Sequence, residues 1–380
     1  MNIEAYIPNQ ALLREYIADG TVTARFHKTL PLTILCYGRK ATYEDIWDEV
    51  TCKTRGLIVD DKGEIVARPF EKFFNANHIG RPETALEELL KEPSPPFFSE
   101  KLDGSMGTLY SYNGYSAIAS KGSFHSEHAE WASKWYHWFT RTTRSAQSLG
   151  PVWPIDYTPV FEMICQEVQH HVVHYEKDRL ILIGLVNNRS GEELSHGALK
   201  MYGDLNGIEV VKRHKSIDLH TALQEDRPNA EGYVATWYRN GAPPLRVKIK
   251  HETFLKLQRL RNGTTPKYIW RLLAGEEGQI GDYYYALGAA DPFLKSQILE
   301  WTKAYQTAYY TYLADAARIM KLALTTCDTR KEFAEVFMRE ENRKLASTCF
   351  RMLDQEDHQP AIWKLVYPEV AKQRYTPEEE

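Results

Sequence analysis

The pattern of apolar residues changes near residue 252, and this change constrains the fold more than any other feature of the sequence. Before it, short apolar or alternating runs are separated by glycine-containing turns, a pattern typical of antiparallel β-structure. After it, helix-length amphipathic segments at 293–324 and 330–353 dominate, and runs of β-branched residues disappear. We therefore expect an α+β domain with antiparallel β-sheets over residues 1–255, followed by an all-helical domain over residues 256–380.

Two hairpins are expected in the first domain. The stronger one spans residues 106–120 around Asn113-Gly114, because this pair accepts a positive φ at both central positions of a two-residue turn. A second hairpin is expected over residues 55–70, and one helix over 127–140. Further strands are expected at 97–100, 160–165, 180–187, 207–211, 232–238 and 245–250.

The charge of the chain limits its partners. Its 380 residues are 43% hydrophobic and 26% charged, as in an ordinary globular protein. The formal net charge of −4 argues against a strongly basic nucleic-acid binder, so any polyanion must be bound by a local patch. Such a patch is present, since residues 239–261 hold seven Lys or Arg against one Glu, an excess of six.

The cysteines and the apolar runs indicate where the protein works. Its five cysteines include no C-x-x-C pair, and the odd number favours reduced thiols. The N-terminus lacks a secretory signal, and no apolar stretch approaches the roughly 20 residues that a membrane helix needs. We expect a cytoplasmic protein with no membrane partner.

Lysines at the ends of two strands are the first candidates for chemistry. Lys101 ends an apolar strand and is followed by Asp103-Gly104, although a solvated lysine before a turn explains this pattern equally well. Lys248 and Lys250 lie on one face of the last strand, because side chains alternate with a period of two. They form a positive patch of phosphate size, for which a solvated edge strand is the alternative.

Acidic residues and histidines suggest two kinds of metal site. Glu162 lies in an apolar run, where a buried carboxylate needs a cation unless the side chain faces outward. His170, His171 and His174 have spacings that place pairs of them on one helix face, but the glutamate of H-E-x-x-H is missing. Exposed loop histidines are therefore favoured over a transition-metal site. The sequence contains neither a Walker phosphate loop nor a G-x-G-x-x-G fingerprint.

Four motifs in a fixed order give the sequence a family resemblance. They are, in chain order, Lys101-Leu102-Asp103-Gly104, Phe161-Glu162, Glu231-Gly232 and Lys248-Ile249-Lys250. With them the chain resembles the covalent nucleotidyltransferases, the superfamily of polynucleotide ligases and mRNA capping enzymes. It is most similar to the phage RNA ligase 1 family of ATP-dependent, tRNA-repair RNA ligases. Further marks of that family are Tyr37, Arg55-Gly56, Lys72-Phe73-Phe74-Asn75 and Ser120-Lys121-Gly122-Ser123.

The resemblance implies a ligase-type nucleotidyltransferase domain, and it implies a role for each motif. Lys101 is implied to attack the α-phosphate of ATP, and the AMP then passes to a 5′-phosphate RNA end. The residues implied to bind ATP are Tyr37, Arg55, Lys72, Lys101, Glu162, Glu231, Lys248 and Lys250. Lys121 is implied to act at the RNA end. Implied ligands of Mg²⁺, or of Mn²⁺, are Glu162, Glu231 and Asp282, although an exposed helix cap explains Asp282 equally well.

The chemistry of a lysine nucleophile adds one expectation. A protonated lysine is a poor nucleophile, so Lys101 needs burial or neighbouring cations to lose its proton. Lys248 and Lys250 are positioned in the sequence to supply those cations. We therefore expect them to lower the pKa of Lys101.

The resemblance also suggests partners, and two alternatives stay open. It implies an RNA substrate, a tRNA with a broken anticodon loop, with RNA specificity from the helical domain and an end-healing kinase-phosphatase as partner. One alternative is another covalent nucleotidyltransferase, either a GTP-dependent capping enzyme or a DNA ligase. These enzymes usually have a β-rich domain after the motif that Lys248-Ile249-Lys250 resembles, where this chain turns helical. The other alternative is a catalytically silent RNA-binding module.

Overall fold

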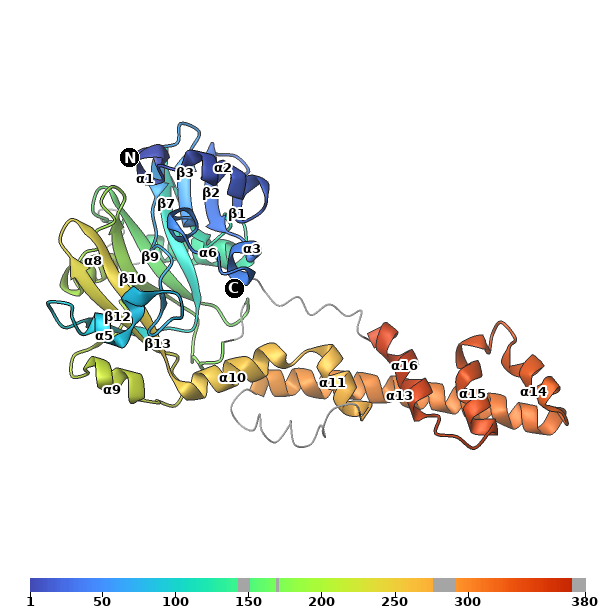
Figure 1. Cartoon of the computed structure of the whole chain (residues 1–380). Coiled ribbons are helices and arrows are strands. Elements are labelled where there is room, and N and C mark those ends of the chain that lie inside the picture. Colours follow the sequence, from blue (N-terminus) through green and yellow to red (C-terminus); the bar gives the residue numbers. More distant parts are fainter. Residues whose placement is uncertain (143–150, 169–170, 276–291, 371–380) are drawn as a thin grey trace. The chain divides into compact units, whose positions relative to one another are not determined.

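The computed structural model describes residues 1–142, 151–168, 171–275 and 292–370. The chain divides into two compact units, one from Met1 to Leu255 and the other from Lys256 on. In the described part of the chain, no helix combines the length and hydropathy that crossing a membrane requires. Figure 1 shows the strands of all three sheets gathered in the first unit.

The first sheet is a four-stranded antiparallel meander in the order β1-β2-β3-β4. Its strands are β1 (Val22–Phe26), β2 (Leu32–Tyr37), β3 (Arg55–Asp60) and β4 (Ile65–Ala67). The accompanying helices are α1 (Ile3–Tyr6), α2 (Gln10–Ala18), α3 (Arg39–Tyr43) and α4 (Glu49–Lys53). The pairing of β2 with β3 places Tyr37 beside Arg55, because Tyr37 N–H donates to the carbonyl of Thr54 at 2.6 Å.

The second sheet has the order β10-β9-β7-β8, and all its pairs are antiparallel. Its strands are β7 (Ser105–Tyr112), β8 (Tyr115–Ser120), β9 (Tyr157–Ile164) and β10 (Arg179–Asn187). The hairpin predicted from Asn113-Gly114 is confirmed, with φ values of 50° and 81° at these two residues. Helices α6 (Glu127–Thr142) and α8 (His196–Asn206) contribute to its apolar core.

The third sheet has the order β11-β6-β12-β13-β5, in which only the short β5 is parallel to its neighbour. Its strands are β5 (Phe74–Asn75), β6 (Phe97–Lys101), β11 (Arg213–His214), β12 (Gly232–Arg239) and β13 (Ala242–Lys250). The small elements η1 (Pro82–Thr84), α5 (Leu86–Leu89) and α9 (Leu219–Gln224) accompany it. Side chains on one face, among them Phe98, Tyr233 and Ile249, pack into an apolar core, which leaves the other face for charged residues.

The strand predicted at 207–211 is wrong. Gly207 adopts a left-handed conformation, with φ of 68°, and ends helix α8. The segment that follows packs against β10 through one isolated bridge, between Val210 and Leu182, rather than through a ladder. Its apolar residues are buried as a loop, and the strand of this region is β11, which starts two residues beyond the predicted range.

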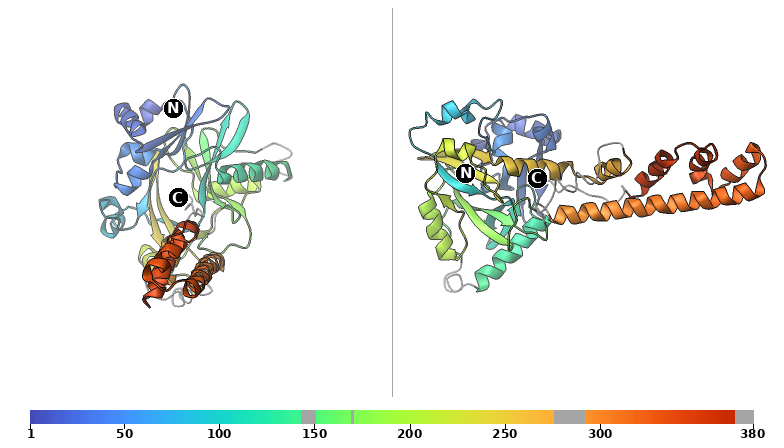
Figure 2. Two further views of the ribbon diagram at one scale, coloured as in Figure 1. Left: turned by 90° about the vertical axis from the view of Figure 1, so that its right-hand side faces the viewer. Right: turned by 90° about the horizontal axis from the view of Figure 1, so that it is seen from below.

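The second unit is helical. Its described helices are α10 (Glu252–Gly263), α11 (Pro266–Leu273), α13 (Pro292–Thr326), α14 (Arg330–Phe337), η2 (Arg343–Leu345), α15 (Ala346–Leu353) and α16 (Gln359–Val370). Figure 2 shows the long α13 with α14, α15 and α16 lying along it. Helix α10 starts before the division between the units, and its Phe254 is buried in the core of the first unit.

The helix-length amphipathic segment at 330–353 forms two α-helices rather than one. Helix α14 ends at Phe337, and helix α15 starts only at Ala346. The side-chain amide of Asn342 donates to the carbonyl of Val336 at 2.9 Å, so a side chain satisfies an oxygen that a continuing helix would have bonded. The break lets α14 and α15 fold against each other and bury a shared apolar core with α13.

Candidate active site

Three strands of the third sheet bring the lysines together. Gly232, the first residue of β12, lies opposite Lys101 on β6 and opposite Lys250 on β13. Residues opposite each other point to the same face of a sheet, so Lys101 and Lys250 leave it on one side, where Lys248 joins them. Ile249 points to the other side and is buried, which confirms the expected shared face of Lys248 and Lys250.

Two glycines allow the backbone to pack closely around this row. A Cβ atom on Gly232, whose φ is 146°, would lie 1.9 Å from the carbonyl oxygen of Ile249. A Cβ atom on Gly104 would lie 2.7 Å from the carbonyl oxygen of Met163 and 2.8 Å from Cγ of Glu162. A larger residue at either position would move the segment that carries Lys101 or Glu231.

Glu231 forms ion pairs with Lys101 and Lys250. Its Oε2 lies 2.7 Å from Nζ of Lys101, and its Oε1 lies 3.0 Å from Nζ of Lys250. Glu231 is 3% exposed, so the contacts are shielded from water. A buried carboxylate with two ammonium partners fixes both lysines relative to β12.

The pKa of Lys101 shifts against expectation. Burial lowers it, but the carboxylates of Glu231 and Glu162 outweigh burial and raise the pKa of Lys101 above its usual value. The expectation that Lys248 and Lys250 lower this pKa is therefore not met in this structure. Lys101 is held as an ammonium and must lose a proton before it can act as a nucleophile.

Glu162 approaches Lys101 from the second sheet. It lies on β9, opposite Met106 on β7, and its Oε1 accepts a hydrogen bond from the Gly104 N–H at 3.0 Å. Burial raises the pKa of Glu162 to about 7, although Lys101 opposes the shift. The expected carboxylate next to a cation is thus present, although its side chain is half-buried rather than fully buried.

Lys248 lies among cations and next to an aromatic ring. Its Nζ is 4.9 Å from the ring centroid of Phe73, and Cζ of Arg55 is 5.6 Å from the same centroid. Burial, followed by the charges of Lys101, Arg55 and Lys72, lowers the pKa of Lys248 well below its usual value. Within the described part of the chain, no carboxylate forms an ion pair with Lys248 or Lys72. This group of positive charges suits a polyanionic ligand.

Aromatic rings surround the ammonium group of Lys72. Its Nζ lies 4.3 Å from the ring centroid of Trp47, 5.2 Å from that of Tyr37 and 5.5 Å from that of Phe74. Nζ of Lys121 lies 5.1 Å from the ring centroid of Tyr37. Cation–π contacts of this kind orient the ammonium groups without neutralising them.

Tyr37 is affected by the same cations. Burial raises the pKa of Tyr37, but Arg55, Lys121 and Lys72 outweigh burial and lower it. Ten site residues were predicted, and the structure brings nine of them together, all in the first unit. Trp47 was missed, because an aromatic residue in a stretch without periodicity or a motif gives no signal in the sequence.

Two other predicted features need separate comment. Asp282 lies outside the described residues. His171 and His174 lie in a segment without helical structure, so they do not share a helix face, and His170 is not described. Among the residues that the structure describes, no group of three His, Cys, Asp or Glu side chains gathers to hold a metal ion.

The basic run at 239–261 is not one free surface. Arg239 pairs with Glu92 at 3.0 Å, and Arg246 forms a bidentate pair with Glu193. Lys250 pairs with Glu231, as described above. The patch expected from composition is therefore partly used in ion pairs within the first unit.

A cavity of about 310 Å³ opens beside the row of lysines. Lys101 and Glu231 line it together with Val173, Tyr175 and Asn229. Its position next to the amino group of Lys101 makes it a candidate site for part of a ligand.

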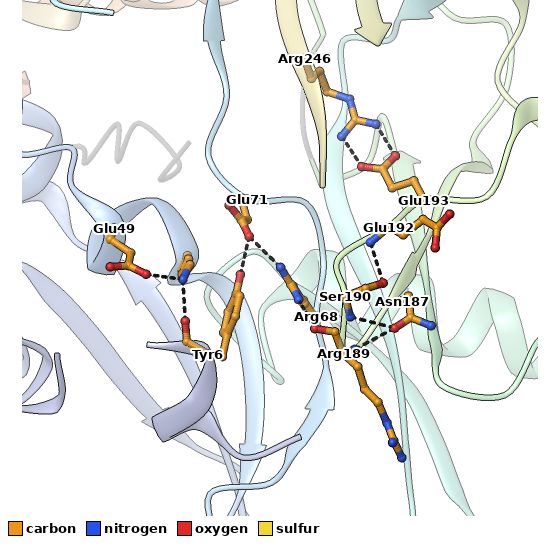
Figure 3. A network of polar contacts seen from close by, with 11 residues as sticks. Tyr6, Glu49, Arg68, Glu71, Asn187, Arg189, Ser190, Glu192, Glu193 and Arg246 are labelled. Atoms are coloured by element: carbon orange, nitrogen blue, oxygen red, sulfur yellow. Dashed lines mark hydrogen bonds and ion pairs between the residues drawn. The ribbon is translucent and has the colours of Figure 1, made fainter. Parts of the chain in front are cut away.

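A second cavity, of about 400 Å³, borders Lys72. Figure 3 shows two ion pairs from its lining, Arg246 with Glu193 and Arg68 with Glu71. The carboxylate of Glu71 also accepts a hydrogen bond from the hydroxyl of Tyr6 at 2.9 Å. These arginines already have carboxylate partners, so the second cavity is less suited to anions than the site around Lys248.

Comparisons with known proteins identify similar sequences and structures. The sequence model of the family described as RNA ligase matches residues 53–253, more than half of the chain. A protein from Thermovibrio ammonificans named "Putative RNA ligase" is 31% identical over 198 residues, which are 52% of this chain and 50% of that protein. The chain thus spans about half the length of this curated relative.

Solved structures of an RNA ligase from Naegleria gruberi are also similar. A variant solved with ATP and Mn is 15% identical over 47% of this chain and 56% of that chain, with a TM-score of 0.37. Another variant, solved with AMP and Mn, is 15% identical over 65% of this chain and 82% of that chain, also with a TM-score of 0.37.

Proposed function

Because this chain belongs to the RNA ligase family, we propose that it is an ATP-dependent ligase that joins 5′-phosphate and 3′-hydroxyl RNA ends. The observation that carries the proposal is the row on β6, β12 and β13, in which Gly232 lies between Lys101 and Lys250. Lys101 is the proposed nucleophile, Glu231 is a buried carboxylate, and Lys248 and Lys72 have no carboxylate partner among the residues that the structure describes. These are the parts that nucleotidyl transfer needs.

In the proposed reaction, the neutral amine of Lys101 attacks the α-phosphate of ATP. The bond to the β-phosphate oxygen breaks, pyrophosphate leaves, and AMP stays on Lys101 as a phosphoramidate. AMP then passes to the 5′-phosphate of an RNA end. A 3′-hydroxyl attacks this adenylated end, which forms the phosphodiester bond and releases AMP.

The cations around Lys248 are proposed to hold the phosphates. Lys248 and Arg55 lie against the ring of Phe73, and Lys72 lies in the aromatic group of Tyr37, Trp47 and Phe74. Fixed positive charges stabilise the charge that develops on phosphate oxygens in the transition state. Lys121, whose ammonium group lies near the ring of Tyr37, is proposed to act at the RNA end.

Glu162 and Glu231 are proposed to hold a Mg²⁺ or Mn²⁺ ion. Their carboxylate oxygens are hard ligands, and magnesium usually takes one or two carboxylates together with substrate phosphates and waters. Glu162 fits this role, since among the described residues only one of its oxygens accepts a hydrogen bond, from the backbone of Gly104, whereas Glu231 would have to give up an ion pair with Lys101 or Lys250 to bind the ion. A bound divalent ion would neutralise phosphate charge. The same ion would weaken the hold of the carboxylates on the ammonium of Lys101.

The substrate is proposed to be a tRNA with a broken anticodon loop, with RNA choice residing in the helical unit. An end-healing kinase-phosphatase is proposed to supply the 5′-phosphate and 3′-hydroxyl ends. Capping enzymes and DNA ligases usually have a β-rich domain after the motif that Lys248-Ile249-Lys250 resembles, whereas helices follow it here, which supports RNA ligation over those reactions. A silent RNA-binding module remains the second candidate, and it forms no covalent adduct.

Labelling with nucleotide tests the proposal. The protein is incubated with Mg²⁺ and with α-labelled ATP, α-labelled GTP or NAD labelled in its AMP moiety, and is then denatured and separated by electrophoresis. We expect label from ATP alone, and none in Lys101→Ala. Lys134→Ala, which changes an exposed lysine of α6, serves as the control and should label like the wild type.

Three results would overturn the proposal. They are an adduct with GTP, labelling that persists without Lys101, and a wild-type protein that takes no label from ATP. The last result would support the silent RNA-binding module.

A further inference from the structure

The segment after β9 contacts the turn that follows Lys101. The carboxylate Oδ2 of Asp103 accepts hydrogen bonds from the backbone N–H groups of Val172, at 2.6 Å, and Val173, at 3.0 Å. The Asp103 N–H donates to the hydroxyl of Tyr175 at 2.8 Å. Three hydrogen bonds thus join two segments about 70 residues apart in the sequence.

The same segment contacts the loop before Glu231. The side-chain oxygen of Asn229 accepts from the His174 N–H at 2.6 Å, and its amide nitrogen donates to the His174 carbonyl at 3.0 Å. Asn229 has a φ of 52°, a left-handed conformation that asparagine adopts more readily than most residues. One side chain therefore pairs with both backbone groups of His174.

We propose that residues 172–175 form a clasp that fixes the Lys101 turn relative to the Glu231 loop, with Tyr175 and Asn229 as positioning residues. The inference rests on the proposed function, because it explains how Lys101 and Glu231 are held for nucleotidyl transfer. The clasp contacts the chain near each of the two site residues. Asp103 lies two residues after Lys101, and Asn229 lies two residues before Glu231.

Burial separates the two halves of the clasp. Val173 and Tyr175 are each 7% exposed, so their contacts with Asp103 are shielded from water, whereas His174 and Asn229 are exposed. Removing one partner of a buried hydrogen bond leaves the other partner unsatisfied, which costs more than the loss of an exposed hydrogen bond whose groups can bind water instead. The Tyr175 half therefore has the larger effect on position, and the Asn229 half the smaller.

The charge of Asp103 agrees with this role. Burial and the charge of Glu231 raise the pKa of Asp103 to about 6, while the N–H groups of Val173 and Val172 and the charge of Lys101 act in the opposite direction. Burial disfavours the charged form of Asp103, and the N–H groups of the clasp stabilise that form by donating hydrogen bonds to it. Val173, His174, Tyr175 and Asn229 all line the cavity beside Lys101.

Tyr175→Phe and Asn229→Gly test the clasp. The first removes only the hydroxyl, and the second keeps a backbone that accepts positive φ while removing the amide. Two matched controls lie away from Lys101. Tyr136→Phe removes the buried hydroxyl that accepts from Trp153, and Asn206→Ala removes an amide that bonds both backbone groups of Val152.

Two measurements separate positioning from general structure. The first is the rate of lysine–AMP formation at saturating ATP, together with the KM for ATP. The second is the affinity for an ATP analogue with a methylene group between the α- and β-phosphates, which cannot be cleaved. We expect Tyr175→Phe to slow adduct formation by about tenfold or more, because small displacements of reacting groups have effects of this size. Asn229→Gly should slow it less.

Binding of the analogue should change by less than about threefold in both clasp variants, and both controls should form the adduct at the wild-type rate. Wild-type rates in Tyr175→Phe and Asn229→Gly, with a labelled wild type, would overturn the clasp but leave the proposed function intact. Equal losses of rate and analogue binding would also overturn it, since they indicate a general loss of structure. A wild type without label would overturn the proposed function and the clasp with it.

Discussion

Lys101 and Lys248 lie in the same site, yet their pKa values shift in opposite directions. Burial lowers both, but Lys101 has Glu231 and Glu162 beside it, whereas Lys248 has mainly other cations. The two lysines are therefore suited to different roles. Carboxylates hold Lys101 in place as an ammonium. Lys248 lies among cations, so a bound phosphate would stabilise its positive charge.

Glu162 should lower the stability of the protein at neutral and higher pH. Its pKa is raised to about 7 in the folded protein, so the folded state binds the proton more tightly than the unfolded state. Stability is therefore lost as the pH rises from the unfolded pKa through the folded one. Glu162→Gln mimics the protonated carboxyl, and we expect it to stabilise the protein by up to about 3 kcal/mol at pH 8 but by less than about 1 kcal/mol at pH 5, where only the unfolded state has lost most of the proton.

The measurement is urea unfolding of wild type and Glu162→Gln at both pH values. Glu130→Gln, which changes an exposed glutamate of α6, is the control and should match the wild type at both. If Glu162→Gln were less stable than the wild type at pH 8, the carboxylate would be a net stabilising partner of Lys101 rather than a strained one. The expected gain in stability would accompany a loss of adduct formation, as is common for functional sites.

At the scale of elements, the register of the strand pairs in the third sheet positions the lysines of the site. Residues from three strands meet at one end of the third sheet because Gly232 pairs with both Lys101 and Lys250. The loop at the other end of β12 and β13 contains Gly241, which has a φ of 67° and no atom within 4 Å of a Cβ built on it. The two glycines share a positive φ but differ in the space around them.

Replacing each glycine by alanine separates backbone strain from close packing. Gly241→Ala should cost about 1–2 kcal/mol of unfolding free energy, the cost of a left-handed alanine. Gly232→Ala should cost more than about 3 kcal/mol, because the new Cβ would lie 1.9 Å from the carbonyl oxygen of Ile249 and the ladder would have to move. Urea unfolding measures both. Equal costs would show that β13 shifts easily and that register there does not fix the lysines.

These elements also show what the sequence can and cannot predict. The shared face of Lys248 and Lys250 and the Asn113-Gly114 hairpin were predicted because a period of two and turn chemistry are local signals, whereas most of the other site residues came from the family resemblance. The strand at 207–211 was wrong, and the segment at 330–353 forms two helices, because a glycine cap and an asparagine side chain end helices at points that apolar patterns do not reveal. Contacts such as Tyr175 with Asp103 join residues far apart in the chain, and no local pattern encodes them.

At the scale of the whole chain, helix α10 joins the two units. It runs from Glu252 to Gly263, and the division between the units falls at residue 255. Phe254 is 2% exposed and packs in the core of the first unit, and Nζ of Lys250 lies 5.1 Å from its ring centroid. The first turn of α10 is therefore part of the unit that holds Lys101, whatever role the later helices have.

Two fragments of different length use this overlap to separate catalysis from the choice of RNA. The fragment 1–263 keeps the whole of α10, and we expect it to form lysine–AMP from ATP at the wild-type rate. The fragment 1–251 lacks Phe254, and we expect it to lose about 3–5 kcal/mol of stability, as for the loss of a buried phenylalanine, and to label poorly. Urea unfolding and ATP labelling compare the two.

The choice of RNA is then measured on 1–263 by competition between a tRNA broken in its anticodon loop and an unstructured RNA of equal length with the same ends. The full chain should prefer the broken tRNA, and 1–263 should seal both at similar rates, because the helical unit is proposed to read the tRNA. A fragment that keeps the full preference would place specificity in the first unit. A fragment 1–251 as stable as 1–263 would show that the first unit does not depend on Phe254.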